Sequence, residues 1–153
     1  MVDYLEMNDY TNAILIEPPT SAMGLQTFKI GTANTIMPGW AVTNVGEAEG
    51  WCTNPNAGDN SVIGIVLDSD LAPLDERIPG GVLVTVAMKG SNAVVYVYCA
   101  NTDAQNPGVP YRAMDNDTGC VGASAGHLLA IGVNTEYTAG HASYNPIKIR
   151  LCQ

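Results

Sequence analysis

Short stretches of apolar, β-branched and aromatic residues recur along this chain, separated by Gly, Pro, Asn and Asp. Residues 147–151 (IKIRL) alternate between apolar and basic side chains, as a strand with one solvated face does. No stretch keeps the 3.6-residue period of an amphipathic helix for about eleven residues, and residues 71–78 (LAPLDERI) suit one helical turn. The pattern predicts an all-β chain of about nine or ten strands. The clearest strands are expected at residues 27–31, 40–44, 61–68, 82–90, 93–100, 127–134 and 147–153.

Two of these strands are predicted to form a hairpin. Residues 82–89 and 93–100 are joined by Gly90-Ser91-Asn92. Gly and Asn both tolerate the positive φ angles that tight hairpin turns require. We therefore expect these two strands to pair directly with each other.

The chain also contains an internal repeat. Residues 38–52 read PGWAVTNVGEAEGWC, and residues 107–121, at an offset of 69, read PGVPYRAMDNDTGCV. Each segment is followed by a small-residue loop and then by a strand that contains Ile-Gly, with the glycine at Gly64 in the first copy and Gly132 in the second. A glycine inside a strand usually marks a bulge, a bend or a close backbone approach.

The repeat predicts the shape of the fold. Its copies, about residues 38–90 and 107–153, each present an apolar face that one meander cannot bury alone. Packed together, they are expected to form a small barrel, β-tulip or sandwich built from a duplicated β-meander. We therefore expect residues 27–153 to form a single β domain.

Residues 1–26 differ from the rest and are predicted to form an extended N-terminal arm. They contain four acidic residues, no basic residue and a Pro18-Pro19 break that stops both helix and strand. An exposed apolar run usually marks an interface, and strand addition to a neighbouring sheet would satisfy its backbone groups. The arm is expected to reach a neighbouring subunit or a partner surface through Tyr10, Ile14, Leu15 and Ile16.

The charge balance narrows the range of partners. Fifteen acidic residues face six Lys and Arg, for a net charge of −9. Nucleic acids and anionic membranes repel such a surface, so neither is an expected partner. No apolar run approaches the roughly 20 residues that span a bilayer, and the N-terminus lacks the basic region of a signal peptide. The chain is therefore expected to be made in the cytoplasm without export.

Motifs for catalysis or metal binding are weak. Residues 122–126 (GASAG) match the G-x-S-x-G pattern around Ser124, but a strand rather than a helix is predicted to follow, so the nucleophile elbow lacks its context. Residues 115–119 (DNDTG) resemble the start of a calcium loop without its Gly at position 6 or its distant Glu, and are expected to be a solvated hairpin tip. There is no Cys-His cluster and no phosphate-binding loop. We expect no catalytic residue, cofactor or metal, and no enzymatic activity.

Trp40 and Trp51 flank the first predicted hairpin of the repeat. Large aromatic side chains of this kind pack in cores, anchor protein interfaces or stack against sugars. Core packing or a protein interface is the favoured interpretation, and a sugar platform is the alternative.

The four cysteines permit three disulfide pairings, and free thiols remain an alternative. The repeat places Cys52 and Cys120 at similar tips, and Cys99 and Cys152 late in strands that follow the two meanders. If disulfides form, pseudo-symmetry favours Cys52–Cys120 and Cys99–Cys152.

Glycine spacing and strand order together resemble the capsid decoration, or cement, proteins of tailed viruses. The similarity rests on a PG turn before an apolar strand, a tip that ends in Gly, the strands IGIVLD and VTVAMKG, and then PG, G, AIGV and a closing basic-apolar strand. It covers about residues 27–153. It implies a β-barrel or β-tulip protein that stabilises the outside of an icosahedral head, commonly as a homotrimer on the major capsid protein lattice. The expected location is therefore the virion surface.

Two other functions stay open from the sequence. A carbohydrate-binding or adhesive β module would use Trp40, Trp51 and the tyrosines as stacking surfaces. A serine hydrolase would use Ser124.

Overall fold

The computed structural model is an all-β protein, as the strand pattern predicts. It describes residues 14–31, 36–44, 48–54, 62–69, 78–99, 106–113, 121–122, 130–137 and 145–152. Among the elements whose bounds the structure describes, the 3-10 turn η1 (Ala22–Gly24) is helical and the others are strands. The strands are β1 (Leu15–Glu17), β2 (Leu25–Ile30), β3 (Ala41–Val42), β4 (Trp51–Cys52), β5 (Gly64–Ser69), β6 (Leu83–Met88), β7 (Val94–Cys99), β8 (Pro110–Ala113), β9 (Val121–Gly122), β10 (Ala130–Asn134) and β11 (Asn145–Arg150).

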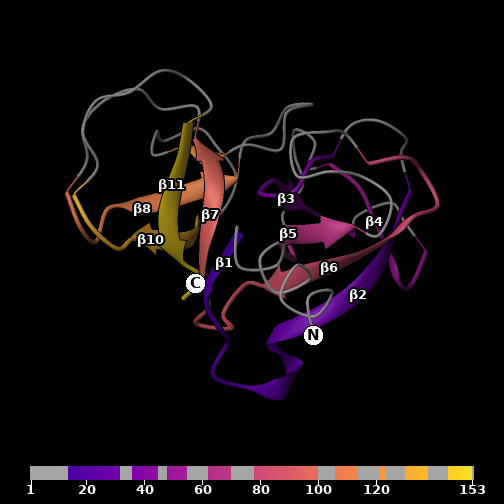
Figure 1. The fold of residues 1–153 in the computed structure, drawn as a ribbon, viewed down its shortest axis with the longest axis horizontal. Helices are drawn as coiled ribbons and strands as arrows, with labels where there is room; N and C mark the ends of the chain where they lie inside the picture. The colour runs from indigo at the N-terminus through magenta and orange to yellow at the C-terminus, as the bar shows by residue number, and fades with distance from the viewer. Residues whose placement is uncertain are drawn as a thin grey trace, which may run out of the picture.

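The strands form two sheets that lie side by side (Figure 1). The first sheet has the order β3-β5-β6-β2-β4, and the second has the order β1-β7-β11-β10-β8-β9. Each sheet curls back on itself. An antiparallel bridge between Thr43 and Thr53 joins the ends of the first sheet, and a β7–β9 pairing closes the second.

The two sheets are copies of one topology. Strands β2 to β6 of the first correspond in order to β7 to β11 of the second. In each copy the first strand pairs with the third in parallel, β2 with β4 and β7 with β9. The other shared pairings are antiparallel. The structural repeat therefore begins one strand earlier than the repeat read from the sequence, since β2 and β7 also belong to it.

Backbone hydrogen bonds repeat with the topology. Gly39 N–H donates to the Val66 carbonyl at 2.7 Å, and Gly108 N–H donates to the Asn134 carbonyl at 2.8 Å. Both glycines have positive φ, 88° and 85°. The PG turns recognised in the sequence are thus the same turn in the same place of each copy.

The predicted hairpin between residues 82–89 and 93–100 is wrong. β6 belongs to the first sheet and β7 to the second, and they do not pair with each other. The connecting turn does use positive φ at Gly90 (76°) and Asn92 (67°). However, Asn92 N–H donates to the Leu151 carbonyl at 2.9 Å, which directs the chain into the second sheet.

The glycines inside the Ile-Gly strands mark close backbone approaches, as predicted. A Cβ built on Gly64 would overlap the Ala87 carbonyl oxygen of β6, and one on Gly132 would overlap the Arg150 carbonyl oxygen of β11. Because the obstacle in both cases is backbone, neighbouring side chains cannot relieve it by changing rotamer.

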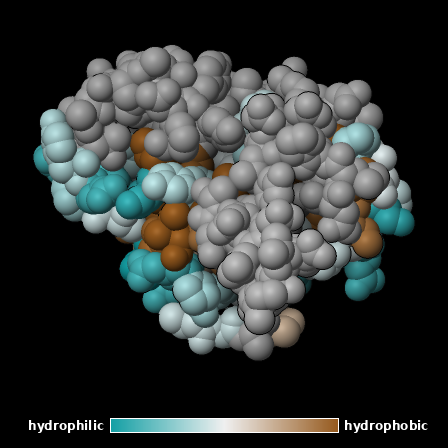
Figure 2. All heavy atoms as spheres, viewed as in Figure 1, coloured by the Kyte–Doolittle hydropathy of each residue, from teal (hydrophilic) through white to brown (hydrophobic). Residues whose placement is uncertain are grey.

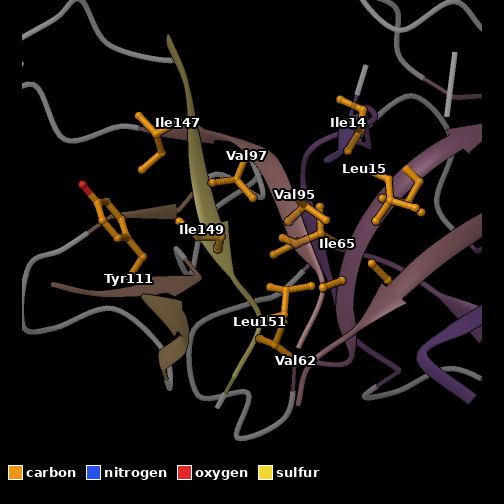
Figure 3. Packing of buried hydrophobic residues seen from close by; sticks show 14 residues of the cluster. Ile14, Leu15, Val62, Ile65, Val95, Val97, Tyr111, Ile147, Ile149 and Leu151 are labelled. Carbon is orange, nitrogen blue, oxygen red and sulfur yellow. The ribbon is translucent and has the colours of Figure 1, made fainter. Parts of the chain in front are cut away.

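Buried side chains form two clusters, one of which is shared by the sheets. β5 connects them: Val66 points into the cluster of the first sheet, while Ile65 and Leu67 lie in the other cluster with Val95 and Val97 of β7 (Figure 3). Residues 65–67 are all fully buried, so β5 is covered on both faces. The apolar face predicted for residues 147–151 is confirmed, because Ile147, Ile149 and Leu151 are buried in the shared cluster.

The close approach at Gly132 predicts a specific sensitivity. Gly132→Ala should lower the free energy of unfolding by about 1–3 kcal/mol, since the new methyl group must displace β11 backbone. Gly108→Asn is the matched control, because Asn tolerates positive φ and nothing lies within 4 Å of the added Cβ. Urea denaturation followed by circular dichroism measures both, and equal stability of the two variants would contradict the close packing of β10 on β11.

Candidate functional site

The N-terminal segment docks on its own chain. β1 pairs antiparallel with β7, with Leu15 opposite Val95. Ile14 and Leu15 are buried in the shared cluster, so the expectation that they contact a partner is corrected (Figure 3). Their burial removes apolar area that an isolated arm would leave in water. Ile16 remains 38% exposed, whereas Tyr10 lies outside the described residues.

Polar contacts fix this segment after the strand ends. The Arg150 guanidinium donates to Glu17 Oε2 at 3.0 Å and, through its other terminal nitrogen, to the Asn92 carbonyl at 3.0 Å. Thr20 N–H donates to the Ser91 carbonyl at 3.1 Å. The ion pair is part-exposed and contributes modestly by itself, so the buried apolar residues provide most of the anchoring.

The two tryptophans do not form a shared platform. Trp40 is 6% exposed, which removes it from the expected partner surface and leaves no sugar-stacking face. Its backbone also joins β5, because its carbonyl accepts from Val66 N–H at 3.0 Å. Trp51 is half-buried, and Lys29 Nζ lies 5.1 Å from the centroid of its ring. The Lys29 ammonium therefore lies over one face of the Trp51 ring.

The outer face of the second sheet carries paired charges. Lys148 Nζ lies 3.6 Å from Glu136 Oε1 and 5.8 Å from the centroid of the Tyr96 ring. Arg150 is likewise engaged by Glu17. Both basic residues of β11 are therefore matched by acids of the same chain, and the excess negative charge of the protein is left to face its surroundings.

The cysteines do not follow the expected pseudo-symmetric pairing as a set. Cys99 lies opposite Asn145, whereas Arg150, two residues before Cys152, lies opposite Val94. The β7–β11 ladder therefore separates the backbones of Cys99 and Cys152 by about 17 Å or more. A disulfide requires Cα atoms within about 7 Å, so the Cys99–Cys152 pairing is corrected. Cys152 is an exposed free thiol.

Cys52 is buried in the cluster of the first sheet. Cys120 lies outside the described residues, so the Cys52–Cys120 pairing stays a prediction.

Most of the candidate catalytic and metal-binding residues lie outside the described ranges. Ser124, residues 115–119 and both histidines are among the residues that the structure does not describe. Within the described residues, no three His, Cys, Asp or Glu side chains gather as metal ligands would. The described part also has no helix with the length and apolar character needed to cross a membrane.

Of the exposed apolar side chains in the described part, sequence reasoning named Ile16 and missed Met23, Leu83 and Tyr137. The large hydrophobic residues exposed in the described part are Ile16 (38%), Met23 (69%), Leu83 (50%) and Tyr137 (61%). On the face shown in Figure 2, apolar atoms of described residues form small patches among hydrophilic ones. The run VLVTVAM gave a signal for Leu83, because it is apolar at Leu83 as well as at the buried positions Val84 and Val86.

The different burial of two cysteines predicts selective labelling. Maleimide added to the native, unreduced protein should modify the exposed Cys152 and leave the buried Cys52 unmodified. The reason is access, since a thiol must meet the reagent to react. Peptide mapping by mass spectrometry assigns the sites. Modification of Cys152 only after reduction would show that it is in a disulfide and would contradict this arrangement.

Comparison with known proteins identifies no relative: no protein-family model matches the sequence, and a search of curated proteins finds no significant match. The function proposed next therefore rests on the sequence pattern, the fold and the surface of this chain alone.

Proposed function

We propose that this protein is a structural virion protein that binds and stabilises the outer surface of an icosahedral capsid, as a homotrimeric decoration protein. The observation that carries the proposal is the placement of the residues behind the sequence resemblance. The PG turns at Gly39 and Gly108, and the Ile-Gly strands at Gly64 and Gly132, occupy equivalent positions in two curled sheets. The residues on which the resemblance rests are therefore repeated elements of this fold, which supports the proposal.

The architecture suits a mechanical role. The first sheet closes through the Thr43–Thr53 bridge and the second through the β7–β9 pairing, and β5 contributes side chains to both clusters. A load applied to one sheet therefore acts on side chains packed against the other. Many copies, each contributing weak contacts to a lattice, would stabilise a capsid through effective concentration.

The negative charge of this chain favours binding to a basic surface on its partner. The chain has a net charge of −9, and the described bases of β11 are already matched by Glu17 and Glu136. We infer that acids near the N-terminus, Asp3, Glu6 and Asp9, face basic groups of the major capsid protein. Such contacts steer association and weaken as salt screens them. The proposed location is the virion surface, after synthesis in the host cytoplasm.

Binding to particles of the encoding virus that lack this protein tests the proposal. The full chain should co-sediment with these particles at low salt and dissociate as salt rises. Replacing the three acids together, D3N/E6Q/D9N, should weaken binding roughly tenfold, at about 0.5 kcal/mol for each lost charge contact.

The control replaces an exposed acid elsewhere, E49Q, and should bind within about twofold of the original chain. Failure of the full chain to bind particles at any salt concentration would reject capsid binding. Binding of the full chain that is unaffected by D3N/E6Q/D9N would reject only the role of the N-terminal acids.

A further inference from the structure

The segment before β2 is buried only at its two ends. Ile14 and Leu15 lie in the shared cluster, and Gly24, which leads into β2, is buried as well. Between them, every residue whose side chain the structure describes is exposed, except the half-buried Pro19. We call residues 14–23 the strap. A segment with so few buried side chains belongs to the part of a protein that opens at low free energy.

The backbone pairing of the strap is short. β1 has three residues, and its register against β7 shifts between Leu15 and Glu17. Pro18 and Pro19 follow directly and have no N–H with which to continue the ladder. Beyond them, Thr20 N–H donates to the Ser91 carbonyl at 3.1 Å. The strap is therefore held by two buried side chains, a short ladder and polar contacts along its exposed part.

The body of the protein keeps its own bonds without the strap. β7 pairs with β11 from Cys99, opposite Asn145, to Val94, opposite Arg150. The turn between the sheets is held from the other side, because Asn92 N–H donates to the Leu151 carbonyl at 2.9 Å and Leu151 N–H donates to the Ala93 carbonyl at 2.8 Å. None of these bonds involves a strap residue. Opening the strap therefore costs its own contacts, above all the burial of Ile14 and Leu15, and leaves both ladders in place.

Arg150 connects the strap to that turn. Its guanidinium donates to Glu17 Oε2 and to the Asn92 carbonyl, each at 3.0 Å. The equivalent residue of the first sheet is Ala87, since Gly64 approaches the Ala87 carbonyl oxygen as Gly132 approaches that of Arg150. The cation thus occurs in the copy that carries the strap. The Arg150 and Glu17 side chains are 36% and 57% exposed, so dissolved salt screens their attraction.

We propose that the strap opens and recloses while both sheets stay folded, and that the ion pair between Arg150 and Glu17 makes this opening sensitive to salt. Opening brings Ile14 and Leu15 into water and frees the side of β7 that β1 covers at Val94 and Val95. The strap is a conformational device of the single chain. The proposal needs no partner and does not depend on capsid binding.

Amide hydrogen exchange measured by NMR on the full chain tests the independent opening. Thr20 and Leu151 are the reporters, because both N–H groups donate to carbonyls of the same turn, one from the strap and one from the body. Val94 is a third reporter: backbone groups alternate along a strand, so those of Val94 face β1 when the Ala93 carbonyl accepts from Leu151. After correction for intrinsic rates, Thr20 and Val94 should exchange at least about tenfold faster than Leu151.

Glu17→Gln tests the ion pair. It should speed exchange of Thr20 and Val94 by about twofold to fivefold and leave Leu151 unchanged, as expected for loss of an exposed ion pair. Glu136→Gln is the matched control, because it removes the other acid paired with β11, one that is similarly exposed (62%), and it should leave all three amides unchanged. Added sodium chloride should speed Thr20 exchange in the original protein and have little effect in Glu17→Gln.

The outcomes separate the two parts of the proposal. Exchange of Thr20 and Val94 at the rate of Leu151 would show that the strap opens only when the body unfolds, and would overturn the proposal. Fast exchange of Thr20 and Val94 that responds equally to Glu17→Gln and Glu136→Gln would overturn the role of the Arg150 ion pair.

Discussion

Neither sheet of this protein can bury all of its apolar side chains alone, and β5 is where the two sheets depend on each other. Ile65 and Leu67 pack into the shared cluster with β7, while Val66 packs into the cluster of the first sheet. Full burial of side chains of this size contributes about 1.5–3 kcal/mol each. A cavity made on the β7-facing side of β5 therefore removes support from both repeats, so the two copies of the meander are expected to fold as one unit.

The need to bury apolar side chains also determines which strand edges of the two sheets are covered. Each sheet closes on itself, and β1 covers part of the remaining side of β7 while burying Ile14 and Leu15. Among the described residues the first sheet has no such strand, although the order of its other strands is the same.

Sequence reasoning succeeded where a pattern reports local geometry. The alternation of residues 147–151 predicted a strand with one buried face, and the repeated Ile-Gly predicted close backbone approaches.

Sequence reasoning failed where strands or cysteines must be matched with residues that are far away in the sequence. The turn at Gly90 and Asn92 suits a hairpin but links two sheets, and β4 and β9 are too short to show any period. Pseudo-symmetry suggested Cys99–Cys152, but an antiparallel ladder places those residues at opposite ends. Among the candidate site residues, the apolar run that contains Leu15 was expected to contact a partner, and sequence alone could not show that β7 of the same chain accepts it.

Native-state hydrogen exchange of Leu67→Ala tests the shared core most directly. Leu67 belongs to the first repeat, and its truncation leaves a cavity that should cost about 2–5 kcal/mol. If the repeats form one cooperative unit, the free energy of opening should fall by the same amount for amides of β6 in the first sheet and of β11 in the second. Lower protection of β6 with unchanged protection of β11 would show two independent folding units and contradict the account.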